Sequence, residues 1–408
     1  MDSYQFILDV AVILIFTKAL GLLSRKVNMP QVVGSLLAGL LLGPAFLGII
    51  KDTNFIKSVA EIGVIILMFS AGLETDINGL KKCGKAAFII ALCGVLVPLA
   101  GGFAVAYFLL DETIIQDVFI GVILTATSVS ITVETLRELG KLKSKSGNAI
   151  LGAAIIDDIL GIIGLTIVTS MADTSVKISV VMLKIVGFFV FIGVIAFVGY
   201  FGYKKLEHRL TERRHRYSIM ALAMCLIMSY CSEYFFGVAD ITGAFFAGLI
   251  IASTQRTHYI ESKFDVLSYL FFSPMFFASI GLQVVLPKMS AQIVIFAVVL
   301  TVVAILTKII GCGAGALACG YEMKHSVRIG VGMISRGEVA LIVADKGLKV
   351  NLISDNLMGP VVIVVIVTTI ITPLLLKLVY RSKPLEPQDV QESMYQKLET
   401  IDDERYDK

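Results

Sequence analysis

Thirteen long apolar stretches constrain the fold of this chain more than any other feature. They lie at residues 4–24, 31–50, 55–74, 86–110, 117–137, 147–171, 178–202, 217–236, 240–254, 265–286, 291–316, 327–348 and 355–380. Most are long enough for a helix to cross a hydrocarbon core of about 30 Å. Hydrophobic residues make up 57% of the 408 residues and charged residues 16%, where about 25% charged residues is usual in soluble proteins. The sequence predicts an all-α membrane protein with about thirteen transmembrane helices, and it excludes a soluble enzyme, a disordered chain and a nucleic-acid-binding protein.

The loops between these stretches alternate in charge. Basic residues gather in every second loop, for example at Arg25 and Lys26 and in the run 204–216, whereas the loop 111–117 is short and acidic. Cytosolic loops carry the excess of Lys and Arg, so the pattern predicts an N-terminus outside and a C-terminus in the cytosol. Residues 381–408 are then a short cytosolic tail, too short for a regulatory nucleotide-binding domain.

A few ionisable residues interrupt the apolar stretches. Asp157 and Asp158 are adjacent in GAAIIDDILGIIG, Lys308 lies in AILTKIIGCGAG, and Arg336 and Glu338 lie in GMISRGE. At about 1.5 Å of rise per residue, Asp157, Lys308 and Arg336 all fall about 12–14 Å from the predicted cytosolic edge, near the midplane. Charges at that depth are costly, and one lysine cannot neutralise two carboxylates. The cluster therefore indicates a functional site and not only a structural ion pair.

Two stretches are interrupted near their middles by small and polar residues, TATSVSIT (125–132) and GMISRGE (332–338). Seven spans separate them, so they would run in opposite directions, as in inverted-repeat transporters whose paired broken helices build the site. Hydroxyls or freed carbonyls at Thr127 and Ser128 would then complete the coordination of a cation. Arg336 and Glu338 would screen the dipoles of the half-helices or pair with each other. The alternative is that the small residues only permit close helix packing.

The paired aspartates predict a chemistry. An ionised carboxylate offers a small cation both charge and oxygen ligands, and a protonated one offers neither in full. Sodium ions and protons would therefore compete for one group, and competition at a site with alternating access gives antiport. No residue pattern in the chain points to a cofactor.

At these residues the chain resembles a known family. The segments that carry the likeness are FSAGLETD (69–76), TATSVSIT (125–132), GAAIIDDILG (152–161), GAFFAGLI (243–250), FFASIGL (276–282) and ISRGEVALI (334–342). Together they resemble the second monovalent cation:proton antiporter family, and the midmembrane lysine is similar to that of its NapA-type sodium/proton antiporters. The likeness covers nearly all of residues 1–380.

The resemblance implies an inverted-repeat antiporter fold with two crossing broken helices, in a homodimer in the prokaryotic inner membrane. It assigns an ion-binding core to about 86–171 and 291–380, and a dimerisation part to about 1–74 and 217–286. The helix at about 178–202 would link the two parts.

The resemblance also implies residue roles. Asp158 would be the principal carrier of cation and proton, and Asp157 would pair with Lys308 while the cation is absent. Cation binding would then release Lys308 and make exchange electrogenic. Glutathione-gated potassium efflux relatives typically carry Gln-Asp at these two positions and a C-terminal nucleotide-binding domain. This chain has Asp-Asp and only a short predicted tail, and both differences favour the sodium branch.

Exchange of Na⁺ or Li⁺ for H⁺ is the favoured function, and K⁺/H⁺ antiport is the alternative that spacing leaves open. A sodium-coupled symporter of organic anions would need a roomy cavity and separate sodium ligands. An intramembrane aspartyl protease would need its two aspartates on facing helices, whereas Asp157 and Asp158 are sequential on one. A gated channel would show a filter-like repeat. The predicted partners are the ions, membrane lipids and a second copy of the chain.

Overall fold

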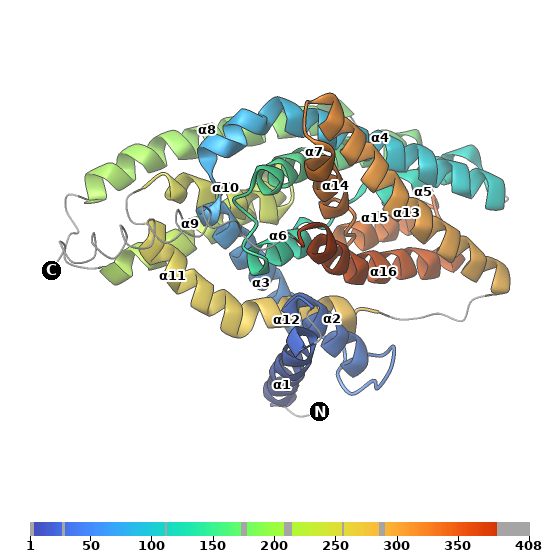
Figure 1. Cartoon of the computed structure of the whole chain (residues 1–408), viewed down its shortest axis with the longest axis horizontal. Helices are drawn as coiled ribbons and strands as arrows, with labels where there is room; N and C mark the ends of the chain where they lie inside the picture. Colours follow the sequence, from blue (N-terminus) through green and yellow to red (C-terminus); the bar gives the residue numbers. More distant parts are fainter. Residues whose placement is uncertain are drawn as a thin grey trace.

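The computed structural model describes residues 4–26, 29–110, 112–172, 178–207, 214–254, 257–284 and 290–381. Within these ranges the chain is entirely helical and contains no β-strand (Figure 1). The elements are α1 (Gln5–Lys26), α2 (Gln31–Leu42), α3 (Asn54–Glu74), α4 (Ile77–Leu109), α5 (Ile114–Thr125), α6 (Val129–Glu138), α7 (Lys145–Ala172), α8 (Ile178–Glu207), α9 (Arg214–Phe236), α10 (Asp240–Ala252), α11 (Thr257–Leu267), the π-helical segment η1 (Ser268–Phe272), α12 (Ser273–Leu282), α13 (Ala291–Ala318), α14 (Met323–Gly332), α15 (Glu338–Lys349) and α16 (Asp355–Val379). Except for Arg381, the predicted tail lies outside the described residues.

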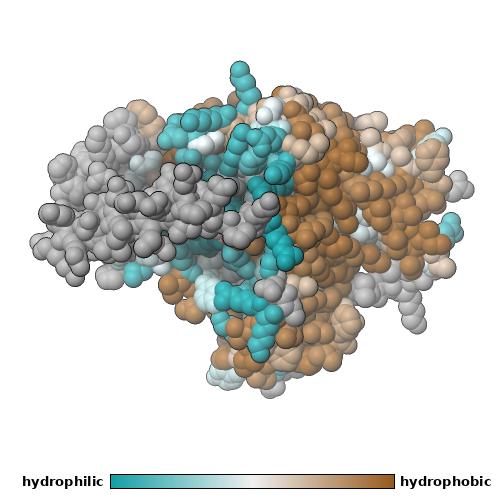
Figure 2. Space-filling model, in the orientation of Figure 1, coloured by the Kyte–Doolittle hydropathy of each residue, from teal (hydrophilic) through white to brown (hydrophobic). Residues whose placement is uncertain are grey.

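The all-helical membrane prediction is confirmed. In the described part of the chain, 10 helical segments are long and apolar enough to cross a membrane. The other three predicted stretches form α2, α10 and the interrupted pair α14–α15, so the count of thirteen stays a prediction. In Figure 2 an apolar surface extends over α4, α5, α13 and α16, and hydrophilic residues form a band beside it. An apolar surface this extensive is what a lipid-facing protein presents.

Polar residues just before several helices fix where those helices begin. The Thr53 hydroxyl accepts a hydrogen bond from the Ile56 N–H at 3.3 Å, and the Asp76 carboxylate accepts one from the Asn78 N–H at 3.0 Å. Each satisfies an N–H that has no partner within its own helix. Thr53 directly precedes α3, and Asp76 lies between the end of α3 and the start of α4. Polar residues at the boundaries of the apolar stretches thus mark where both helices begin.

The helices pack as two groups. We call α4–α7 with α13–α16 the site helices, because they hold the buried charges, and α1–α3 with α9–α12 the flanking helices. Among the site helices, α4 packs along α5, α7 and α13; among the flanking helices, α3 packs along α10 and α12. Helix α8 contacts α7 of one group and α9 and α10 of the other. This grouping follows the predicted division into a core, a dimerisation part and a linker, whose separate roles stay a prediction.

Glycines allow α4 and α5 to approach each other closely. A Cβ atom added to Gly121 of α5 would lie 2.4 Å from the carbonyl oxygen of Leu99 on α4. One added to Gly102 of α4 would lie 2.8 Å from the Gly121 Cα. Small residues at such crossings bring helix backbones into contact where no hydrophobic effect drives association.

The substitution Gly121→Ala should therefore destabilise the protein, by about 1–3 kcal/mol if the helices shift to accommodate the methyl group. Thermal unfolding in detergent would measure the loss as a lower midpoint. Gly84→Ala is the matched control on α4, because no atom lies within 4 Å of the added Cβ there. Equal midpoints for the two variants would contradict the close-packing account.

Candidate ion-binding site

Two interrupted helices meet in the middle of the site helices. Residues 126–128 separate α5 from α6, and residues 333–337 separate α14 from α15. The Ser128 N–H donates to the Ser335 carbonyl at 2.8 Å, and the Ser335 hydroxyl donates to the Ser128 carbonyl at 2.6 Å. Non-helical backbone at membrane depth is tolerated only where protein or a water-filled cavity surrounds it. Here each interruption supplies hydrogen bonds to the other.

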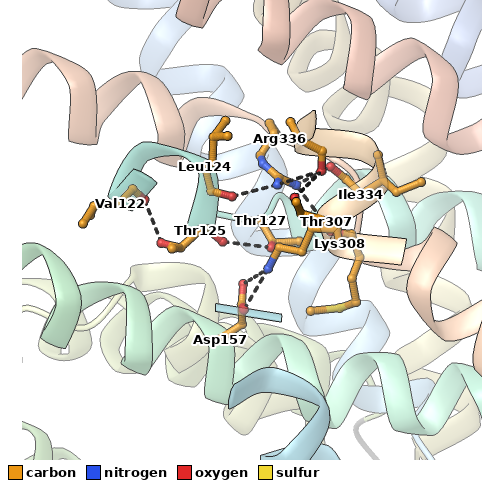
Figure 3. Close-up of polar contacts among 11 residues, drawn as sticks. Val122, Leu124, Thr125, Thr127, Asp157, Thr307, Lys308, Ile334 and Arg336 are labelled. Atoms are coloured by element: carbon orange, nitrogen blue, oxygen red, sulfur yellow. Dashed lines mark hydrogen bonds and ion pairs between the residues drawn. The ribbon is translucent and has the colours of Figure 1, made fainter. Parts of the chain in front are cut away.

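Arg336 is fully buried beside the interruptions. Its guanidinium donates to the carbonyl of Ile334 and, at 2.7 Å, to that of Leu124 (Figure 3). Leu124 is in the last turn of α5, so the positive charge lies at the negative end of a half-helix. Glu338 is the first residue of α15, at the positive end of another. In the described residues Arg336 and Glu338 form no ion pair with each other, and the screening role of the two charges stays a prediction.

Lys308 and Asp157 form a buried ion pair. The Lys308 Nζ lies 3.0 Å from Asp157 Oδ1 and 3.2 Å from Oδ2, joining α13 to α7 (Figure 3). Lys308 is 0% exposed and Asp157 is 2% exposed. On the same helix, Leu306 and Ile310 are 49% and 60% exposed, because residues two positions from Lys308 point to the other side of α13. The charged face of α13 is therefore turned inward and its apolar face outward.

Asp158 is in a different environment from its neighbour. Consecutive residues of a helix point about 100° apart, and Asp158 turns away from Lys308. In the described structure it takes part in no ion pair, and it is less buried than Asp157. Among the described residues, its one hydrogen bond comes from the hydroxyl of Thr242 on α10, at 3.5 Å from Oδ2. One carboxylate of the pair is thus neutralised and the other is not.

Thr127 and Ser128 are buried at the α5–α6 interruption. The Thr127 hydroxyl donates to the Thr125 carbonyl at 3.4 Å, and the Ser128 hydroxyl lies 3.2 Å from that of Ser130. Within the described ranges, no hydrogen bond joins either residue to the aspartates. The structure thus brings Lys308 to Asp157, but it does not bring Thr127 or Ser128 into hydrogen-bonding contact with Asp158.

A cavity of about 900 Å³ opens between the two helix groups. It is lined by the N-terminal half of α3, the last turn of α9, the first turn of α10, and by α12, α15 and α16. Its charged lining is mostly acidic: Asp52, Glu61, Glu233, Asp240, Glu338 and Asp345, with Lys57 as the basic residue. Lys57 is itself paired with Asp52 at 3.1 Å. The cavity therefore attracts cations, and it reaches Glu338 beside the interruption.

The other end of α3 is tied to the site helices by charges. Arg137 of α6 pairs with Glu74 of α3 at 2.6 Å and with Asp265 of α11, and lies 3.9 Å from Glu134; we call these four residues the Arg137 cluster. The neighbouring Glu138 carboxylate accepts hydrogen bonds from two N–H groups at the start of α2, at 2.7 and 3.1 Å. These contacts hold α6 against α2, α3 and α11, at the opposite end of α3 from the cavity.

The sequence analysis assigned no site role to Arg137, Glu74 or Thr242. The signal for the Arg137 cluster was present, because FSAGLETD and TVETLRELG both end apolar stretches with charges at the predicted cytosolic edge. Nothing in the sequence shows which of these charges meet.

Comparison with known proteins decides the family. The family described as "Sodium/hydrogen exchanger, transmembrane" matches residues 11–381, most of the chain. The chain belongs to this family. It is 41% identical to the Na⁺/H⁺-K⁺ antiporter GerN of Bacillus cereus, over 93% of this chain and 98% of GerN. It is 39% identical to a Na⁺/H⁺ antiporter of Enterococcus hirae, over 91% of this chain and 97% of the relative.

The fold of the family is seen in a solved structure, that of the sodium proton antiporter MjNhaP1 from Methanocaldococcus jannaschii at pH 8. The two share 18% identity with a TM-score of 0.69, over 92% of this chain and 97% of the other. The predicted resemblance to cation:proton antiporters is confirmed, and the chain is an integral membrane protein of the exchanger class. The family and these relatives are transporters, which argues strongly against an enzyme.

The Lys308–Asp157 pair gives a stability prediction. Lys308→Met leaves a buried carboxylate without its partner and should cost about 3–5 kcal/mol, whereas replacing both partners by apolar residues is often close to neutral. The double variant Lys308→Met with Asp157→Leu should therefore unfold at a higher temperature than Lys308→Met alone. Thermal unfolding of the purified variants measures both effects. Additive losses in the double variant would show that the two side chains do not stabilise each other.

Proposed function

We propose that the protein exchanges Na⁺ or Li⁺ for H⁺ across a prokaryotic cell membrane, with Asp158 carrying the cation and the proton in turn. The unequal environments of the two aspartates carry this proposal: Lys308 pairs with Asp157, whereas Asp158 forms no ion pair among the residues that the structure describes. A carboxylate without a countercharge in a low-dielectric interior gains most by binding a cation or a proton. The names of the bacterial relatives support sodium as the cation and a prokaryotic membrane as the location.

The exchange follows from competition at Asp158. The ionised carboxylate takes a cation that has shed part of its water, and oxygen ligands must replace that water. Thr127 and Ser128 on the α5–α6 interruption are the predicted ligands, and they would reach the ion through a local rearrangement of that backbone. Protonation of Asp158 removes the charge that holds the ion and releases it. Loading on one side and release on the other gives antiport.

Lys308 sets the charge balance in this scheme. Its ammonium is held by Asp157 at 3.0 and 3.2 Å. A cation shared by both aspartates competes for the same oxygens and loosens the ion pair. A lysine released in this way would be a buried charge without a partner, which is costly. Each cation would then displace more than one proton, and the exchange would move net charge across the membrane.

The difference between the two ends of the flanking helices supports alternating access: one end is open and the other is closed by ion pairs. The acidic cavity leads toward Glu338 at one end, and the Arg137 cluster and the Glu138 contacts join the helix groups at the other. With the basic loops in the cytosol, the cavity faces outward and the Arg137 cluster closes the cytosolic side. The site helices would move against flanking helices fixed in a homodimer. The screening of half-helix dipoles by Arg336 and Glu338 would hold the interruptions together during that motion.

One alternative keeps specific support. K⁺/H⁺ antiport uses the same carboxylate chemistry, and the name of GerN includes K⁺. Sodium-coupled symport of an organic anion is disfavoured, because the acidic residues lining the cavity would repel an anion.

Asp158→Asn should abolish cation-driven proton movement in proteoliposomes, because the amide carries no charge to exchange. Proton flux would be recorded with Na⁺, Li⁺ and K⁺ supplied separately, which also decides between the sodium and potassium functions. Asp9→Asn is the matched control: Asp9 is 8% exposed in α1 and accepts a hydrogen bond from Gln5, away from the site. Exchange that persists in Asp158→Asn would remove Asp158 from the mechanism.

Lys308→Gln should make the remaining exchange electroneutral. A glutamine can donate a hydrogen bond to Asp157, but it has no proton to release when the cation binds. Transport by wild type and variant would be compared under imposed membrane potentials of both signs. A voltage response as steep in the variant as in wild type would defeat the proposed role of Lys308.

A further inference from the structure

Asp158 of the site helices is contacted by a residue of the flanking helices. The Thr242 hydroxyl on α10 lies 3.5 Å from Asp158 Oδ2, and the threonine is 3% exposed. Among the residues that the structure describes, this is the only hydrogen bond to Asp158. The neighbouring carboxylate of Asp157 is occupied by Lys308, so the uncompensated member of the pair is the one that reaches across to α10.

The contact crosses the boundary between the two helix groups. Helix α10 packs along α3 and α9, whereas α7, which carries Asp158, packs along α4 and α5. The two residues before Thr242, Asp240 and Ile241, line the acidic cavity, and Glu338 lines it from the side of the site helices. Thr242 thus follows directly on the cavity-lining residues of α10 and is hydrogen-bonded to Asp158.

A threonine hydroxyl suits every state of the carboxylate. It has one donor and two acceptor lone pairs, and its hydrogen can rotate. It can donate to the ionised carboxylate, accept from the protonated one, or turn its oxygen toward a cation bound there. An apolar side chain of the same shape can do none of these.

We propose that Thr242 is a positioning residue for Asp158 in the state that is open to the acidic cavity. Its hydroxyl holds the carboxylate toward the cavity and adds an oxygen beside the bound cation. The contact joins the two helix groups, so it is lost when the site helices move to open the opposite side. The proposal rests on the proposed exchange at Asp158, and it makes cation affinity depend on the side from which the ion arrives.

The test is the apparent KM for Na⁺ of the full-length protein, measured with the ion added from either side of the membrane. Right-side-out and inverted vesicles supply the two sides, and proton flux is the readout. Thr242→Val removes the hydroxyl and keeps the shape. It should raise the apparent KM on the cavity side about tenfold, as expected for the loss of one hydrogen bond to a charged group, with little change in the maximal rate. On the other side the KM should stay near the wild-type value.

Two variants separate the hydroxyl from packing. Thr242→Ser keeps the hydroxyl and should restore the wild-type KM. Thr301→Val is the matched control, because Thr301 is a buried threonine whose hydroxyl donates to the Ala297 carbonyl of its own helix at 2.7 Å. It should leave both KM values unchanged.

A wild-type KM in Thr242→Val would overturn the proposal, and so would equal shifts in the Val and Ser variants. A shift of the same size from both sides would overturn its link to the cavity-open state. Each of these outcomes is distinguishable from failure of the proposed exchange, which appears as transport that survives Asp158→Asn.

Discussion

One positive charge shared unequally between two adjacent carboxylates determines the properties of this site. Lys308 lies against both oxygens of Asp157 in a fully buried position, and the turn of the helix carries Asp158 away from it. Taking an ion pair out of water is tolerable because each partner is satisfied, whereas the remaining carboxylate is not compensated in this way. In the proposed exchange, this uncompensated carboxylate is the group that binds cations and protons in turn. The surrounding helices supply burial, access and movable neighbours.

The interrupted helices solve a second problem, the exposure of backbone polar groups inside the membrane. The Ser128 and Ser335 contacts satisfy parts of each interruption with groups from the other, and Arg336 lies against carbonyls at the end of α5. The same polar groups that stabilise the crossing are within the protein interior, where a dehydrated ion can use them.

The helices and the depths of the buried charges could be predicted from the sequence, because both follow from local rules. Apolar length predicts membrane helices, and the depth of Asp157, Lys308 and Arg336 along their stretches follows from the rise of a helix. Contacts between helices that are distant in the sequence are harder to predict. Nothing local shows that Arg137 meets Glu74 and Asp265, or that Thr242 meets Asp158, because these pairs depend on how α3, α10 and α11 pack. Dipole screening and mutual pairing of Arg336 and Glu338 were equally consistent with the sequence; the described residues contain no ion pair between them, and screening stays a prediction.

The Arg137 cluster has an energetic consequence for a moving transporter. It concentrates one arginine and three carboxylates where two bodies meet, and Glu138 adds backbone hydrogen bonds beside them. If the helix groups separate there once per cycle, these contacts are broken and remade at every turnover. Their combined strength then favours the conformation in which the two helix groups are joined at this end. Binding of the ion must shift the population toward the other conformation. The charge pattern at this boundary would thus tune turnover rate without touching the transported ion.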